Sequence, residues 1–155
     1  MMTPALARVE NFISSYPDLQ VILFDSSTHT AELAAQALGV TPGQIAKTLV
    51  FLADAKAVIV VTCGDKKVDT KQLARSLGVK KVKFAGAELV VELTGFVPGG
   101  VSPLGLTKEI PIYLDQSLYQ YDTVYAAAGT ANSALPVRPD RLKEITGGSL
   151  VSVCK

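Results

Sequence analysis

The spacing of apolar residues along the chain changes between two periods, and each change marks an element. Over Thr3–Ser15, apolar side chains recur every three or four positions, which is typical of one face of an α-helix. Thr3 is a preferred N-cap residue, and Pro4 suits the first helical position. The pattern therefore predicts a helix over this segment.

Two segments rich in β-branched residues, Thr48–Leu52 and Ala57–Thr62, flank the short segment Ala53–Lys56. Two such runs around a short connection predict a β-hairpin. Neither run alternates apolar with polar side chains. We therefore expect both strands to lie centrally in a sheet whose two faces are covered.

Shorter segments complete the pattern. Thr30 is placed to cap a helix that ends at Gly39, and Thr41-Pro42 opens a short turn. The segment Asp69-Thr70-Lys71-Gln72 resembles a capping box at the start of a helix that ends before Gly78. Further helices are predicted over Ala31–Leu38, Ala87–Leu93 and Pro139–Ile145, and further strands over Val21–Phe24, Val82–Phe84, Ile110–Leu114, Thr123–Ala127 and Leu150–Val153.

Strands and helices follow one another without a regular βαβ rhythm, and no repeat or linker divides the chain. A length of 155 residues, with 48% hydrophobic and 19% charged residues, is typical of one well-packed domain. We therefore expect a single compact α/β domain over residues 1–155, built around a mixed sheet.

Several classes of protein are disfavoured by the sequence. The longest apolar run, Ala57–Val61, is far too short to span a bilayer, and from the residues Met1–Ala5 we expect no signal peptide. The two cysteines, Cys63 and Cys154, have neither metal-ligand nor redox spacing, so we expect reduced thiols in a cytosolic protein. The chain also lacks the glycine-rich motif of P-loop nucleotidases and the nucleophile elbow of serine hydrolases.

The net charge of +1 is unevenly distributed. Residues 65–83, which we call the basic segment, carry seven lysines and arginines against two aspartates, a local charge of +5 that leaves −4 for the rest. Such a division is typical of a protein with one face for a polyanion. The alternative is a solvated face that only maintains solubility.

The segment Gly95–Gly105, which we call the glycine loop, holds four glycines and two prolines among large apolar residues. Glycine permits close backbone approaches, whereas proline fixes φ. A flexible linker would be polar and rich in glycine and serine. The composition instead predicts a shaped loop that presents backbone groups to a ligand.

Three further places hold candidate chemistry. Lys47 stands at the entry of a buried strand, where it either reaches solvent or holds a phosphate or a developing negative charge. The single histidine, His29, lies in a polar loop and is either incidental or part of a site, but one histidine without clustered carboxylates does not predict a zinc site. The small polar segment 129–134 is either a tight hairpin turn or a wall of a pocket beside the glycine loop.

These residues together carry a resemblance to a known family. Lys47-Thr48-Leu49, the segment Gly64–Asp69 with its following helix, Thr94-Gly95-Phe96 leading into Gly99–Gly105, and Ala128-Gly129 occur in that order. In this they resemble the YbaK family, relatives of the editing domain inserted in bacterial prolyl-tRNA synthetases. The likeness runs from about Leu23 to Val151, and the glycine loop is its most specific part. The segment Gly129–Ser133 departs from relatives that have a basic, glycine-rich run followed by an acidic residue.

The resemblance implies a fold and an activity. The fold is a single α/β domain with a mixed, partly barrel-like sheet surrounded by helices. The activity is that of a free-standing cytoplasmic aminoacyl-tRNA deacylase, which removes a small amino acid such as alanine or cysteine from tRNA(Pro) without a metal, cofactor or covalent nucleophile. Its partners would be the acceptor end of aminoacyl-tRNA and prolyl-tRNA synthetase, and it would be a monomer or homodimer.

The resemblance, together with the residue patterns, also assigns roles. Lys47, Gly99 and Gly100 are assigned to catalysis, Phe24, His29, Thr30, Val101, Ser102, Pro103, Gly129, Thr130 and Ser133 to substrate binding, and Lys66, Lys67, Lys71 and Arg75 to tRNA binding. An aminoacyl ester is already labile, so orientation, a placed water and charge stabilisation suffice for its hydrolysis. Two alternatives stay open: a module that binds tRNA or a synthetase without turnover, and a hydrolase of some other small ester.

Overall fold

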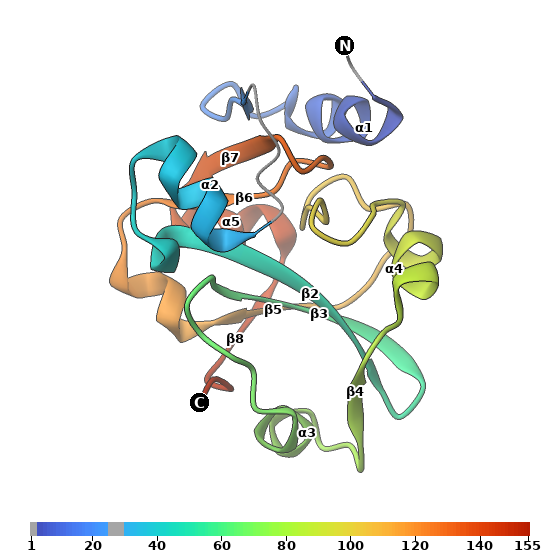
Figure 1. Cartoon of the computed structure of the whole chain (residues 1–155). Helices are drawn as coiled ribbons and strands as arrows, with labels where there is room; N and C mark the ends of the chain where they lie inside the picture. Colours follow the sequence, from blue (N-terminus) through green and yellow to red (C-terminus); the bar gives the residue numbers. More distant parts are fainter. Residues whose placement is uncertain (1–2, 25–29) are drawn as a thin grey trace.

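The computed structural model describes residues 3–24 and 30–155, and within these it shows one mixed eight-stranded sheet with helices around it (Figure 1). The strands follow the order β1-β7-β6-β2-β3-β5-β8, and β4 pairs with β2 beside this path. Their bounds are β1 Ile22–Leu23, β2 Ile45–Ala53, β3 Lys56–Cys63, β4 Val82–Phe84, β5 Ile112–Asp115, β6 Val124–Ala126, β7 Ser133–Val137 and β8 Ser149–Val151. No pairing in the described part joins β1 to β8, so the curved sheet stays an open barrel.

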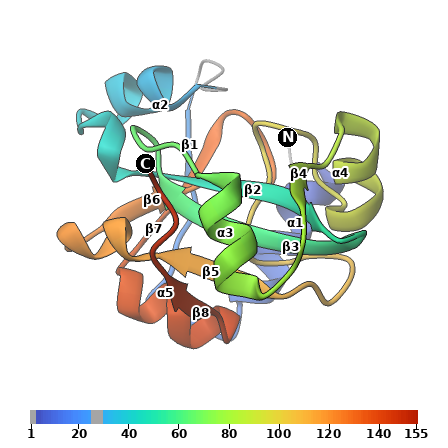
Figure 2. The ribbon, with the colours of Figure 1, turned by 90° about the horizontal axis from the view of Figure 1, so that it is seen from below.

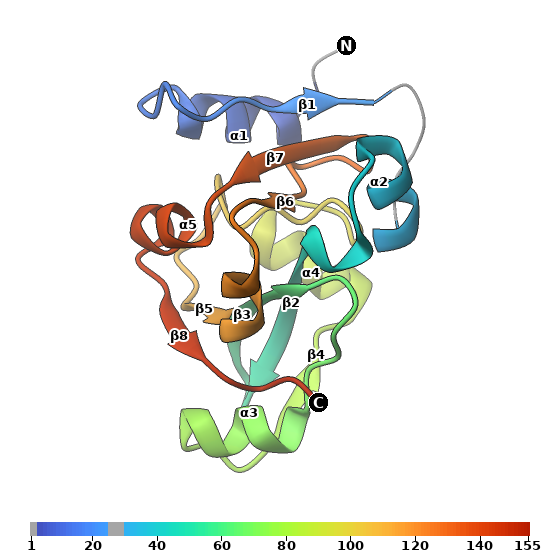
Figure 3. The same cartoon turned by 90° about the vertical axis from the view of Figure 1, so that its left-hand side faces the viewer.

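Five α-helices and two 3₁₀ turns surround the described sheet. They are α1 Pro4–Ile13, α2 Ala31–Leu38, α3 Thr70–Leu77, α4 Ala87–Thr94 and α5 Pro139–Thr146, with turns at Pro42–Gln44 and Gln116–Gln120. Helix α3 lies across β2 and β3 when the molecule is seen from below (Figure 2), whereas α1 lies at the opposite end beside β1 and β7 (Figure 3).

Two hydrophobic clusters occupy the two faces of the central hairpin, because successive residues of a strand point to opposite faces. Val50 and Ile59 belong to the larger cluster, which also holds residues of α1 and Phe96 of the glycine loop. Phe51 and Val60 belong to the smaller cluster under α3. The prediction that both hairpin strands are central and covered is thus confirmed.

The predicted helix starts are formed by side-chain caps. Thr3 and Thr30 accept hydrogen bonds from the backbone N–H of Leu6 and Leu33, and Asp69 accepts from Lys71 and Gln72. The capping box expected at Asp69–Gln72 is wrong in its reciprocal part, because the Asp69 N–H does not donate to the Gln72 side chain. The Gln72 amide donates to the Ser152 carbonyl, and the Asp69 N–H donates to the Val153 carbonyl.

The central hairpin turns tightly at two residues, Asp54 and Ala55, which both have positive φ. At the turn, each strand extends one residue further than the sequence pattern predicts, so the connection is shorter than 53–56. The Asp54 carboxylate accepts hydrogen bonds from the backbone N–H of Lys80 and Lys81, at 3.0 and 2.9 Å. These bonds fix the start of β4 beside the hairpin.

One strand of the sheet was not expected from the sequence. Strand β7 pairs antiparallel with β6 and places Pro136 opposite Tyr125. A proline inside a short run argues against a strand, because it cannot donate to the ladder. The sequence indicated a turn or a cavity wall at 129–134 and no strand at Ser133–Val137. The predicted strands at Ile110–Leu114 and Leu150–Val153 are displaced by one or two residues to β5 and β8.

Candidate functional site

The central strand β2 has an open stretch on one of its edges. On this edge β2 pairs with β6 at residues 45–46 and with β4 at residues 51–53, and no described strand pairs between them. The Val50 carbonyl points to this edge, because it accepts from the Ala85 N–H at 3.0 Å. Residues two apart in a strand direct their peptide groups to the same side. The N–H and C=O of Thr48 therefore face this gap.

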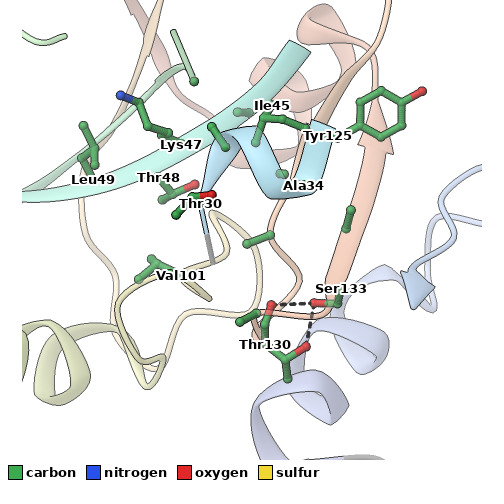
Figure 4. A pocket seen from close by; sticks show the side chains of 18 of the residues that line it. Thr30, Ala34, Ile45, Lys47, Thr48, Leu49, Val101, Tyr125, Thr130 and Ser133 are labelled. Carbon is green, nitrogen blue, oxygen red and sulfur yellow. Dashed lines mark hydrogen bonds between the residues drawn. The ribbon is translucent and has the colours of Figure 1, made fainter. Parts of the chain in front are cut away.

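A cavity of about 380 Å³ lies against the open stretch (Figure 4). Its other walls are the start of α2, residues 99–101 of the glycine loop and residues 125–134 around the β6–β7 turn. Most of the lining side chains are small, and they include Ala31, Ala34, Ala46, Gly64, Ala126, Ala127, Ala131 and Ala134. We call this the main cavity.

Thr48 is the unusual polar residue of the main cavity. Its hydroxyl oxygen is buried and has no hydrogen-bond partner among the described residues. A buried hydroxyl without a partner costs free energy, and such groups are rare in folded proteins. Figure 4 shows Thr48 on β2, at the wall of the cavity that this strand forms. Thr48 thus offers a ligand both an unpaired hydroxyl and unpaired peptide groups.

Lys47 lines the rim of the main cavity rather than its interior. It precedes Thr48 in β2, so its side chain leaves the sheet on the opposite face. Its Nζ donates to the Lys66 carbonyl at 2.6 Å, and in Figure 4 it points away from Thr130 and Ser133. An ammonium group has three donors, so two remain for another acceptor.

The glycine loop is held at both ends by Arg8 of α1. The guanidinium group donates to the Gly105 carbonyl at 3.2 Å and to the Gly95 carbonyl, and it lies 4.6 Å from the centre of the Phe96 ring. Phe96 and Leu104 are buried in the larger hydrophobic cluster. The loop is therefore anchored to the core, and only its central part reaches the main cavity.

The assigned residues of the glycine loop divide into two groups. Gly99 and Val101 line the main cavity. Gly100 is buried beside it: a Cβ there would lie 3.1 Å from the Gly129 carbonyl oxygen, so the two segments pack backbone to backbone. Ser102 is fully buried and accepts from the Leu104 N–H, and Pro103 lines a separate hollow beside Phe12.

The turn between β6 and β7 is a hairpin connection that also forms a wall of the main cavity. Thr130 and Ser133 line it, and their hydroxyls are hydrogen-bonded to each other at 2.9 Å. The Ser133 oxygen also accepts from the Ala128 N–H and donates to the Thr130 carbonyl. Gly129 is buried behind this wall with φ 101°, where a Cβ would lie 2.9 Å from the Ala5 backbone.

Three assigned residues precede helix α2. Thr30 lines the main cavity and caps α2. Phe24 does not line it, although its N–H donates to the Asn132 carbonyl on the neighbouring turn. His29 lies outside the described residues.

The basic segment begins beside the main cavity. Lys66 is joined to Lys47 through its carbonyl, and Lys67, Lys71 and Arg75 are exposed beyond it. Within residues 3–24 and 30–155, the ion pairs are those of Arg141 with Asp18 and Glu144. The lysine and arginine side chains of the basic segment therefore form no ion pair with a described carboxylate, and the segment keeps its net positive charge.

Two features are absent from the described residues. No group of three or more histidine, cysteine, aspartate or glutamate side chains is placed to hold a metal ion. No helix has both the length and the apolar character needed to cross a membrane.

Sequence reasoning missed Thr48, Arg8 and Tyr125 as contributors to this region. In the sequence, Thr48 has no signal beyond its place in Lys47-Thr48-Leu49, and Tyr125 lines the cavity from β6. Arg8 has a local signal: it is a charged residue beside the buried positions Leu6 and Val9 of α1. Its two carbonyl partners lie 87 and 97 residues away, so that signal could not identify them.

Comparison with known proteins identifies a family that this chain matches. Residues 25–145 match the family described as "Aminoacyl-tRNA editing domain". The Enterococcus faecalis protein named "Putative Cys-tRNA(Pro)/Cys-tRNA(Cys) deacylase EbsC" is 30% identical over 152 residues, which are 97% of this chain and 92% of that protein. A proline–tRNA ligase of Bacillus licheniformis is 39% identical over 89 residues, which are 57% of this chain and 16% of the ligase.

A solved structure has nearly the same fold. It is described as "Crystal structure of a putative trans-editing enzyme for prolyl tRNA synthetase" and gives a TM-score of 0.93 at 34% sequence identity. The match covers 100% of this chain and 99% of that one.

Proposed function

The chain belongs to the aminoacyl-tRNA editing domain family, and we propose that it hydrolyses the ester bond of a mischarged aminoacyl-tRNA. The proposed substrate is a small amino acid, alanine or cysteine, attached to tRNA(Pro). The name of the Enterococcus relative supports the cysteine substrate, and the matched segment of proline–tRNA ligase supports the tRNA. The same matches support prolyl-tRNA synthetase as a partner and the cytoplasm as the place of action.

The observation that carries this proposal is the main cavity at the open stretch of β2. Its unpaired Thr48 hydroxyl and peptide groups are fixed hydrogen-bonding groups inside a hollow with small walls. Binding sites typically combine such a hollow with a few placed polar groups. An ester offers acceptor oxygens to the Thr48 donors, which would complete the hydrogen bonds that the protein leaves unmade.

In the proposed reaction, a water oxygen attacks the ester carbonyl carbon. The bond from this carbon to the ribose oxygen breaks, and a proton from the water passes to that oxygen. Negative charge develops on the carbonyl oxygen, to which the Thr48 N–H and hydroxyl would donate. Lys47 lies on the rim with its Nζ turned outward, which favours binding of the terminal phosphate over contact with the carbonyl oxygen.

The lining explains why a small amino acid is proposed. Seven alanines and two glycines are among the lining residues, and the Thr130–Ser133 hydroxyls close one end. A larger amino acid would have to displace the β6–β7 turn, which packs directly on Gly100. Exclusion by volume is an effective sieve against larger amino acids.

The test measures ester loss from alanyl-, cysteinyl-, seryl- and prolyl-tRNA(Pro) with purified protein. We expect the alanyl or cysteinyl ester to be hydrolysed faster than in the protein-free reaction, and prolyl-tRNA(Pro) to be hydrolysed no faster than without protein. Absence of hydrolysis across the panel contradicts the proposal. Binding of tRNA without hydrolysis would instead support the non-catalytic module, which the net positive charge of the basic segment favours equally.

A Lys47→Ala variant tests the role of the lysine, with Lys56→Ala on the exposed start of β3 as the matched control. We expect a rise in KM of about tenfold with little change in kcat, because a phosphate contact is made in both ground and transition states. A fall in kcat at constant KM would assign Lys47 to the carbonyl oxygen instead. Unchanged kinetics would remove Lys47 from the site.

A further inference from the structure

A second cavity of about 280 Å³ continues from the main cavity along the same edge of β2. The two share Thr48, Leu49, Gly99 and Val101, so they open on either side of a common boundary. The two cavities are therefore direct neighbours across these residues. The second cavity ends at β4, where the pairing of β2 resumes.

The lining of the second cavity differs in chemistry from that of the main cavity. Apart from the shared residues it is apolar, and its members are Val50, Phe84, Ala85, Ala87, Val90 and Pro98. No titratable side chain lines it. Such a hollow accepts an uncharged, flat or apolar group and has nothing to bind a phosphate.

Phe84 gives the second cavity an aromatic surface. The residue is 58% exposed, although Phe is among the residues most often fully buried. Its ring is tilted by 37° against the fully buried Phe51, with the centres 4.5 Å apart. This contact fixes the inner side of the Phe84 ring and leaves the rest of it open.

Three lysines lie close to Phe84 along the chain, although the side chain of Lys83 leaves β4 on the opposite face. Lys83 is the neighbour of Phe84 in β4, and Lys80 and Lys81 directly precede the strand. All three are exposed, and none forms an ion pair with a described carboxylate. Proteins bind single-stranded nucleic acid with exposed aromatic rings on which bases stack and with nearby cations that hold the backbone.

We propose that the second cavity binds the nucleobase of the 3′-terminal nucleotide of tRNA, stacked on Phe84, while the aminoacyl ester occupies the main cavity. This assignment rests on the proposed function and extends it from the ester to the nucleotide that carries it. Thr48, Gly99 and Val101 then mark the passage of the ribose between the two cavities. The protein thereby recognises an aminoacyl ester as part of a nucleic acid.

The kinetic test compares alanyl-tRNA with alanine ethyl ester, which has no nucleobase. We expect Phe84→Ala to raise KM for alanyl-tRNA about tenfold or more, in line with loss of one stacked base, and to change kcat/KM for the ethyl ester by less than about twofold. Phe84→Trp should retain the wild-type KM. Leu150→Ala, at another exposed apolar residue, is the matched control.

Equal losses on both substrates would show that Phe84 only supports the fold and would overturn the proposal, as would an unchanged KM for alanyl-tRNA. A second measurement separates this proposal from the proposed function. The trinucleotide cytidyl-cytidyl-adenosine, the common 3′ end of tRNA, is titrated into the protein and the shifts of the Ala85 and Val90 methyl signals are followed by NMR. Shifts that Phe84→Ala abolishes support the subsite even if no ester is hydrolysed, and no shifts at millimolar trinucleotide refute it.

Discussion

Replacing Thr48 with valine should change stability and activity in opposite directions. Valine has nearly the shape of threonine, and β-branched residues suit a strand. The substitution therefore removes the buried hydroxyl that has no partner and leaves the packing of β2 in place. Few substitutions isolate one polar atom so cleanly.

The magnitude follows from the burial of that hydroxyl. An unpartnered buried polar group costs about 1–3 kcal/mol. We expect Thr48→Val to raise the free energy of unfolding by about 1–2 kcal/mol. For a protein of this size, each kcal/mol raises Tm by about 2–4 °C. If the hydroxyl donates to the substrate in the transition state, kcat/KM for alanyl-tRNA should fall about 10- to 100-fold.

Urea denaturation and thermal melting measure the first effect, and the deacylation assay measures the second. The matched control is Thr62→Val in the neighbouring strand β3. Thr62 is fully buried like the Thr48 hydroxyl, but its oxygen is hydrogen-bonded to Cys154 Sγ at 3.0 Å. Its replacement should lower stability by about 1 kcal/mol and leave catalysis unaffected.

A Thr48→Val protein that is less stable than the wild type would show that the hydroxyl has a partner in solution, and the reasoning would fail at its first step. A stabilised variant with full activity would remove the Thr48 hydroxyl from the reaction and leave only its N–H. A stabilised variant with reduced kcat/KM would mean that the protein gives up folding free energy at this position to bind its substrate.

Two further predictions concern the supports of the site. Arg8→Met should lower the free energy of unfolding by about 2–3 kcal/mol and reduce kcat/KM, because it removes the hydrogen bonds to Gly95 and Gly105 that hold the glycine loop. The control Arg141→Met breaks only surface ion pairs and should lower the free energy of unfolding, measured by urea titration, by less than about 1 kcal/mol. Equal losses of stability in the two variants would contradict this account. Asp54→Asn should destabilise the protein at pH 7, because hydrogen bonds from the Lys80 and Lys81 N–H groups hold the pKa of Asp54 below its ordinary value. A carboxyl group with a lowered pKa in the folded state stabilises the protein above about pH 4, and this stabilisation disappears as the pH falls. The wild type and Asp54→Asn should therefore converge in stability at low pH. A constant difference in stability from pH 7 to pH 3 would refute the assignment.

Features that depend on a few neighbouring residues were predictable from the sequence. Thr3, Thr30 and Asp69 cap their helices as expected, since a capping bond joins residues two or three positions apart. The central hairpin and the short strand Val82–Phe84 were also predicted, because periodicity and turn residues lie within the segments themselves. The family likeness is likewise carried by ordered local motifs.

The cavities, in contrast, depend on contacts between distant segments. The open stretch of β2 exists because β6 pairs with one end of that edge and β4 with the other. Neither pairing can be predicted from the residues of β2 alone. Pairing also decided that β7, despite Pro136, is a strand. The roles assigned to Lys47, Gly99 and Gly100 stay predictions, now with different positions relative to the cavity.

The sequence by itself determined which residue types occur together: a lysine before a buried strand, a glycine loop and a basic segment. Only the tertiary structure decided which atoms face the cavity. The alternation of a strand turns Lys47 to one face and Thr48 to the other, and the packing of Gly100 against Gly129 brings two distant turns together. A missing hydrogen bond can be recognised only when the positions of all possible partners are known. The fold therefore identifies Thr48, and the sequence does not.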